Sequence, residues 1–202
     1  RCNFLADAFT KVGTLFNKPV QNYDAWSVRV NKRFAKNWVF QGSYTYSRLI
    51  GNYDGFVSRN TGAINLGASS QYDIPELVRN AYGPLFANVP HVFKLDGFYS
   101  FDLKKAGRLT LGASVRYQSG TPINVQADNN RYQGQFLVYV LPRGAGGRIE
   151  PSYFANLSIS YAYPLPGELE LEFTARLANL TNNKAVLRVD ETYSYSYGRA
   201  IA

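Results

Sequence analysis

Charged side chains stand two positions apart at several places in this 202-residue chain, with uncharged residues between them. Lys94 and Asp96 are one example, and Glu170 and Glu172 are another. Because residues two apart point to the same face of a β-strand, such groups would line one side of a sheet. There they could bind an anionic substrate or, as we favour, hydrogen-bond to another part of the same protein. The predicted set is Arg29, Arg33, Lys94, Asp96, Arg116, Glu170, Glu172 and Arg176.

His91 is the only histidine and therefore the first candidate for acid–base chemistry. A catalytic histidine needs a nucleophile and an orienting group within hydrogen-bond reach, and no serine of the chain lies in a recognisable nucleophile motif. Cys2 is the only cysteine, so the sequence contains no metal-ligand spacing of cysteines. We expect no catalytic residue, no cofactor and no bound metal, and we expect His91 to hydrogen-bond to loop backbone.

Two polar segments could contact an extracellular ligand. Tyr193, Tyr195 and Tyr197 alternate with serines, and exposed aromatic rings can stack on sugars, peptides or catechols. The favoured interpretation is that this run extends a strand. The other segment contains Arg131 and Gln133 and lacks the spacing of a calcium or phosphate loop.

Six stretches of the chain alternate strictly between apolar and polar residues, which predicts β-strands that could position these groups. The clearest has aromatic residues at one parity, Trp38, Phe40, Tyr44 and Tyr46, and uncharged polar residues at the other. Aromatic ends on one face and small polar groups on the opposite face are typical of a transmembrane β-barrel with lipid outside and water inside. No apolar run approaches the ~18–20 residues that a membrane helix needs. The sequence therefore predicts an all-β, antiparallel, up-and-down transmembrane barrel.

The expected strands cover residues 23–34, 38–49, 91–103, 108–119, 152–163 and 169–180. Tight turns at 35–37, 105–107 and 164–168 alternate with long connections at 50–90 and 120–151. We expect Asn37 and Gly107 to adopt the left-handed conformation. In an outer-membrane barrel, short turns face the periplasm and long loops face the outside.

Symmetric closure of the turns predicts the cross-strand register. In the first hairpin, Phe34 would face Trp38 and Trp26 would face Tyr46, all on the outer side. In the second, Phe101 would face Leu111, and Asp96 would face Arg116 inside. In the third, the predicted pairs are Tyr163 with Leu169, Tyr161 with Leu171, Ile159 with Phe173 and Asn156 with Arg176.

The formal net charge of +8 raises the possibility of nucleic-acid binding. However, lysines and arginines are scattered over turns, loops and strands and form no single basic stripe. We therefore expect no nucleic-acid partner.

Phrases distributed along the chain resemble the C-terminal barrel of TonB-dependent receptors of the Oar-like branch. They are NKPV (17–20), VNKRF (30–34), GSYTYSR (42–48), YGPL (82–85), PHVFKLDG (90–97), SGTPIN (119–124), LPRG (141–144) and NLTN (179–182). The resemblance implies a barrel of about 22 strands in the bacterial outer membrane, filled by an N-terminal plug that contacts the TonB complex.

Six strands are too few to close a membrane barrel, because known single-chain barrels have at least eight. The chain also starts at Arg1 and contains no Met. We expect residues 1–202 to be part of a C-terminal barrel domain, without its plug and terminal strand. The predicted partners are outer-membrane lipid, the plug, TonB through the plug and an unknown extracellular solute. The predicted function is uptake of a scarce solute into the periplasm, and the alternative is a structural or adhesive outer-membrane barrel.

Overall fold

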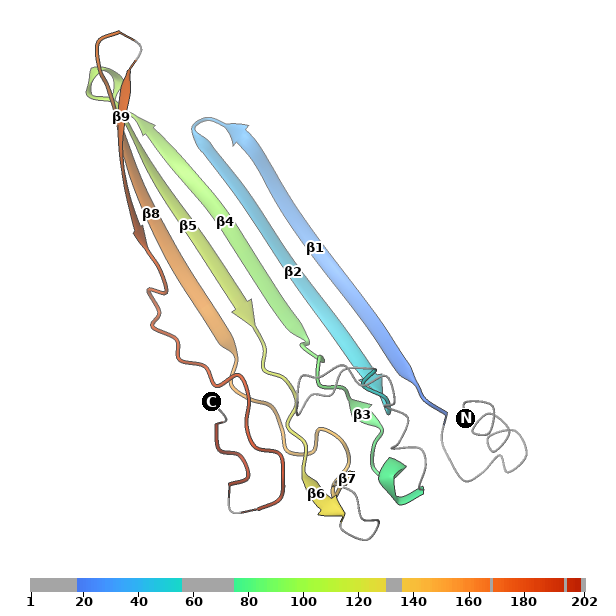
Figure 1. Ribbon diagram of the computed structural model, residues 1–202. Helices are drawn as coiled ribbons and strands as arrows, with labels where there is room; N and C mark the ends of the chain where they lie inside the picture. The colour runs from blue at the N-terminus through green and yellow to red at the C-terminus, as the bar shows by residue number, and fades with distance from the viewer. Residues whose placement is uncertain (1–17, 56–74, 130–135, 168, 195, 201–202) are drawn as a thin grey trace.

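Six long strands form one open antiparallel sheet in the computed structural model of the protein (Figure 1), which describes residues 18–55, 75–129, 136–167, 169–194 and 196–200. They follow chain order across the sheet, with β1 and β9 at its edges. The predicted up-and-down, all-β arrangement is therefore confirmed, and the predicted bounds are displaced by only a few residues. The strands are β1 (Gln21–Ala35), β2 (Trp38–Gly51), β4 (His91–Asp102), β5 (Arg108–Gln118), β8 (Ser152–Pro164) and β9 (Glu170–Leu177).

Short turns lie at one end of the sheet and long loops lie at the other (Figure 1). The loop between β2 and β4 contains the 3₁₀ turn η2 (Pro75–Val78) and the short strand β3 (Gly83–Pro84), which pairs with the end of β2. The loop between β5 and β8 contains β6 (Gln126–Asn129) and β7 (Phe136–Tyr139), which form a separate hairpin. Within the described residues, no helix has the length and hydropathy required to span a membrane.

One face of the sheet, which we call the aromatic face, has rings at both ends and smaller side chains between them. Near the loop end, the cross-strand partners are Tyr44, Phe93, Tyr117 and Tyr153. Near the turn end they are Phe101, Leu109, Tyr161 and Phe173. Between them lie Gly42, Leu95, Val115 and Ala155. Two aromatic girdles flanking an aliphatic band are the pattern of a barrel wall in contact with lipid.

The hydrophobic core lies in the loops, and the aromatic face has no cover within the described chain. Trp26 and Phe173 on this face are each 61% exposed. Of the buried hydrophobic residues that the structure describes, only Ala162 belongs to a long strand, while the others lie in the loop layer at Leu77, Ala81, Leu85, Val125 and Val189. A sheet with this composition requires an apolar surrounding such as lipid.

The first hairpin differs from its predicted form at the turn. Trp26 faces Tyr46 as predicted, but Ala35 rather than Phe34 faces Trp38, because a bulge lies between Lys32 and Ala35. The turn has two central residues, Lys36 and Asn37, with φ of 53° and 67°. Positive φ at both central residues is typical of a type I′ turn, whose twist matches that of the paired strands. The bulge also moves Phe34 from the predicted outer side to the opposite face, where its ring stacks on Phe98 at 5.9 Å.

The second hairpin is displaced by two residues from the predicted register. Leu109 rather than Leu111 faces Phe101, and Ser114 rather than Arg116 faces Asp96. The reason is a longer connection, because the 3₁₀ turn η3 (Lys104–Ala106) extends the loop to residues 103–107. Gly107 has the expected positive φ of 97°, but its ψ of −155° lies outside the left-handed helical region.

The third hairpin is displaced in the same way. Tyr163 faces Leu171, Tyr161 faces Phe173, Ile159 faces Ala175, and Ser158 rather than Asn156 faces Arg176. Pro164 pairs with Glu170, so the connection covers residues 165–169 instead of the predicted 164–168. A displacement of two residues preserves parity, and each side chain therefore remains on its predicted face.

Candidate functional site

The face opposite the aromatic face, which we call the polar face, has a row of cations across its strands. Following the cross-strand register from β1 to β8, the partners are Arg29, Ser43, Lys94, Arg116 and Phe154. We call Arg29, Lys94 and Arg116 the cationic row. Like charges directly opposite each other in a sheet are destabilising, and Lys94 and Arg116 have this arrangement.

Asp96 neutralises one member of the cationic row. Arg116 Nη2 lies 2.9 Å from an Asp96 carboxylate oxygen, and Arg116 Nη1 donates hydrogen bonds to the carbonyls of Leu95 and Val115 at 3.2 and 3.1 Å. Both charged side chains are nearly half exposed, so the pair contributes at most ~1 kcal/mol. Asp96 therefore fixes the direction of Arg116 more than it stabilises the sheet.

Polar groups, most of them uncharged, occupy the polar face on the turn side of the cationic row. One cross-strand row contains Asn31, Gln41, Asp96, Ser114 and Asn156. Closer to the turns, a second contains Ser100, Thr110, Ser160 and Thr174, with hydroxyl contacts of 3.0 Å in the first pair and 2.7 Å in the last. These side chains give the face a hydrophilic surface suited to a watery lumen.

A hollow of about 600 Å³ lies over the middle of the polar face. Val39 and Phe98 form its apolar side, while Asn156 and Arg176 contribute polar groups. The absence of a side chain at Gly112 leaves this space open, since a Cβ there would come within 2.4 Å of Ser158 Oγ. The hollow has the size of a small-molecule site, although it is open along one side of the sheet.

The turn end of the polar face has the opposite charge. Glu170, Glu172 and Asp102 lie there with one strand cation, Arg108. Arg108 Nη2 is 3.2 Å from Glu170 Oε1, and both side chains are more than half exposed. The polar face thus changes from cationic at the cationic row to acidic at its turns.

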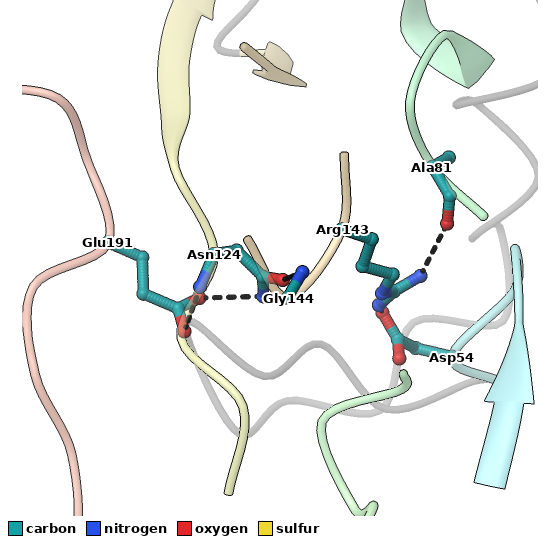
Figure 2. Close-up of polar contacts among 6 residues, drawn as sticks. All are labelled: Asp54, Ala81, Asn124, Arg143, Gly144 and Glu191. Atoms are coloured by element: carbon teal, nitrogen blue, oxygen red, sulfur yellow. Dashed lines mark hydrogen bonds and ion pairs between the residues drawn. The ribbon is translucent and has the colours of Figure 1, made fainter. Parts of the chain in front are cut away.

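A buried network joins the loops beyond the opposite end of the sheet (Figure 2). Arg143, with 1% of its side chain exposed, forms an ion pair with Asp54, and its Nη1 donates to the carbonyl of Ala81 at 3.3 Å. Gly83 is required close by, because a Cβ there would lie 2.5 Å from the Arg143 carbonyl oxygen. Arg143 therefore ties the β5–β8 loop to the β2–β4 loop.

The same network extends to the segment after β9 (Figure 2). Asn124 donates to Glu191 from its backbone nitrogen and from Nδ2, each at 3.1 Å, and Asn124 Oδ1 accepts from the Gly144 nitrogen at 2.9 Å. Burial lowers the pKa of Arg143 to about 10, while the nearby Glu191 carboxylate acts in the opposite direction. Arg143 therefore remains charged at neutral pH, within a network of three loop segments.

The structure places the predicted charged residues of the strands on the polar face, except Arg33. Arg33 lies within the bulge of β1, where the alternation is interrupted. The others follow polar-face parity in the cross-strand register, and Glu170 and Glu172 lie far along the strands from the cationic row. Arg29, Lys94, Arg116 and Asp96 thus lie in or next to the cationic row, and Glu170 and Glu172 lie in the acidic region. Arg176 lies between the two regions, at the hollow.

The predicted ligand-contacting residues of the loops are only partly described. Tyr193 is 71% exposed, and its ring centroid is 6.5 Å from that of Tyr197. Both lie in bends and turns, so the favoured interpretation of a strand extension is wrong, because hydrogen bonds to Asp190 turn the chain here. Arg131, Gln133 and Tyr195 lie outside the described residues.

His91 has a different partner from the expected loop backbone. Its ring lies on the aromatic face, where Nδ1 is 2.8 Å from Tyr44 Oη and the ring centroid is 5.4 Å from that of Tyr46. Lys94 and Asp96, which follow it closely in sequence, have no access to this side of the sheet. In the part of the chain that the structure describes, no cluster of three or more His, Cys, Asp or Glu side chains could hold a metal ion.

The loop network contains none of the predicted site residues. Arg143 follows a proline and precedes a glycine with φ of 79°, which marks a bend, but its partner Asp54 is 89 residues away. Glu191 and Asn124 are also distant in sequence. Nothing in the local pattern indicates that these groups meet.

A family model for the outer membrane beta barrel domain matches residues 2–155. The chain is also 37% identical, over 89% of its length, to the TonB-dependent transporter Oar of Myxococcus xanthus, and it spans 17% of the length of that relative. No solved structure gives a significant match. The resemblance to Oar-like TonB-dependent receptors is thereby confirmed. The chain belongs to the outer membrane beta barrel domain family, and its location is the outer membrane.

Proposed function

We propose that this chain forms part of the wall and the extracellular loops of a transporter that admits an extracellular solute to the periplasm. The observation that carries the proposal is the difference between the two sheet faces: one is aromatic and suited to lipid, and the other has ordered rows of charged and polar groups. A barrel that serves only as an anchor has no need for separate cationic and acidic regions on its inner face. Similarity to a TonB-dependent transporter supports the same proposal.

The proposed complete protein has about 22 strands, of which this chain supplies a consecutive set in the C-terminal barrel domain. Its edges, β1 and β9, pair with strands outside the chain. An N-terminal plug fills the barrel and contacts TonB, so that energy from the inner membrane drives passage. We propose no catalytic role for any residue of the chain.

The test measures which solutes the cells remove from their medium. Wild-type cells, cells lacking the full-length protein and cells lacking TonB are grown in the same medium, and the remaining solutes are quantified by mass spectrometry. We expect at least one solute to be depleted by wild-type cells and by neither mutant. Re-expression of the full-length protein should restore depletion in the first mutant but not in a double mutant.

A structural or adhesive role predicts another result. Cells lacking the protein would then deplete the medium as wild-type cells do, and they would lose attachment to surfaces or to other cells. That pair of observations would replace the transporter proposal.

A further inference from the structure

The cationic row has the geometry of a site for an anionic group. Arg29 and Lys94 both face Ser43 in the cross-strand register, one from each neighbouring strand. Because neighbouring strands lie ~4.8 Å apart, the Cα atoms of the two cations are separated by roughly 10 Å, with the Ser43 hydroxyl between them. Both side chains are long enough to reach one anion held above Ser43, and the hydroxyl can donate a third hydrogen bond.

The charges at this level of the sheet are not balanced by the wall itself. Asp96 pairs with Arg116, and among the described residues no ion pair includes Arg29 or Lys94. Two positive charges therefore remain on one hydrophilic surface, next to a third cation directly opposite Lys94. An added anion would relieve the repulsion and gain charge-assisted hydrogen bonds.

We propose that Arg29, Ser43 and Lys94 form a binding site for a carboxylate or phosphate group of the transported solute. This inference rests on the proposed transport function and adds a chemical class of substrate to it. Arg29 offers a planar pair of donors suited to either group, while Lys94 acts as a compact positive charge on the opposite side. Arg116, held by Asp96, lies on the neighbouring strand β5 and can bind a second anionic group of the same solute.

The location of the site fits capture from outside. On β4 and β5, Lys94 and Arg116 lie close to the loop ends of the strands, whereas on β1 and β2, Arg29 and Ser43 lie near mid-strand. The whole row lies on the loop side of the acidic turn end. The carboxylates Asp102, Glu170 and Glu172 at the turn end would repel the same solute. An anion that enters between the loops therefore reaches the cationic row before it reaches these carboxylates.

The test measures binding of citrate and of inorganic phosphate to the purified full-length protein in neutral detergent, by isothermal titration calorimetry at constant ionic strength. Lys94→Gln and Arg29→Gln should each weaken citrate binding about tenfold, as expected for loss of one charge-assisted hydrogen bond. Lys94→Arg should restore most of the affinity. Lys105→Gln is the matched control, because it removes a cation from the turn that follows β4 and should leave binding unchanged. Heat-modifiable migration on gels checks that every variant has assembled.

Three results would overturn the proposal. The first is binding that Lys94→Gln and Lys105→Gln weaken equally, since this indicates general charge attraction. The second is unchanged binding in both Arg29→Gln and Lys94→Gln. The third is absence of anion binding combined with poorer assembly of Lys94→Gln, since carboxylates of the rest of the protein would then occupy the row. If solute depletion still depends on the protein and on TonB, these results remove the anion site and leave the transport function intact.

Discussion

Arg143 determines how the loop segments are held relative to one another. Its guanidinium is buried beside Asp54, and its neighbour Gly144 donates to Asn124, which in turn binds Glu191. Removing one partner of a buried ion pair leaves an uncompensated charge, which typically costs ~3–5 kcal/mol. The loop layer therefore has an organisation that depends on a few polar side chains as well as on its small apolar core.

Replacing Arg143 with Met should open the loop layer without unfolding the barrel. Asp54 would lose its cation, and we expect the free energy of local opening to fall by about 3 kcal/mol. Hydrogen exchange of the full-length protein, followed by mass spectrometry, should be at least tenfold faster at residues 75–90 and 119–129 and unchanged in the strands. Arg79→Met, at an exposed position of the same loop layer, is the control. Equal exchange in the two variants would contradict the role of Arg143.

The segment after β9 should loosen at low pH. The Ser196 hydroxyl, at 2.5 Å, and the Thr192 backbone amide, at 2.9 Å, donate to Asp190 and lower the pKa of its carboxyl. Because the folded pKa is lower than the unfolded value of ~4, the stabilisation is complete above pH ~4 and is lost as pH falls through the folded pKa. Hydrogen exchange at residues 190–199, corrected for its intrinsic pH dependence, should therefore rise in acid. Ser196→Ala should reduce that dependence, and an unchanged profile would argue against it.

Successive side chains of each strand point to opposite faces of the sheet, so neighbouring residues lie in different environments. Thr110 and Leu111 are adjacent in β5, yet Thr110 lies in the hydroxyl row of the polar face and Leu111 pairs with Tyr99 and Ile159 on the aromatic face. If the aromatic face contacts lipid, neighbouring positions should tolerate charge very differently.

Leu111→Arg should impair assembly of the full-length protein, because Arg on the lipid face near the midplane costs roughly 2–4 kcal/mol. Phe173→Arg, on the same face, should have a similar though smaller effect, since it lies nearer the turn end. Thr110→Arg is the matched control on the polar face and should be milder. The amounts of folded protein in outer-membrane fractions measure the effect, and equal amounts for all three variants would contradict the parity assignment.

The sequence was sufficient to predict the strands, their order and the face of nearly every strand residue, because parity depends only on alternation. It was not sufficient for the register. The turn between β4 and β5 begins two residues earlier than predicted, and the turn between β8 and β9 lies one residue further along the chain, so each hairpin is displaced by two residues. Phe34 was placed on the wrong face because a bulge has no clear sequence signal. The loop network depends on contacts between residues far apart in sequence, such as Arg143 and Asp54, which no local pattern predicts.

The connections at the two ends of the sheet differ in length (Figure 1). The turn end has connections of two to five residues, whereas the loop end holds the buried core and the polar network. In outer-membrane barrels the long connections are extracellular. We therefore expect the loop end of this sheet to face the outside of the cell.

Single cysteines introduced into full-length protein in which Cys2 is replaced by Ser should report that orientation. Tyr82→Cys and Leu187→Cys, at positions 57% and 74% exposed in the loop layer, should react on intact cells with a thiol reagent that cannot cross the outer membrane. Lys36→Cys, in the first turn, should react only after the outer membrane is permeabilised. Labelling of Lys36→Cys alone on intact cells would reverse the orientation.

The bulge in β1 makes one short segment unusually tolerant of a change in chain length. Removal of a single residue elsewhere in β1 would transfer all later side chains to the opposite side of the wall, so that arginines would meet lipid and tryptophan would meet water. Between Lys32 and Ala35, however, two residues occupy the space opposite Val39, and loss of one would leave regular pairing on both sides. A one-codon deletion is therefore compatible with membrane insertion at this site, and natural variation in the length of this hairpin should concentrate there.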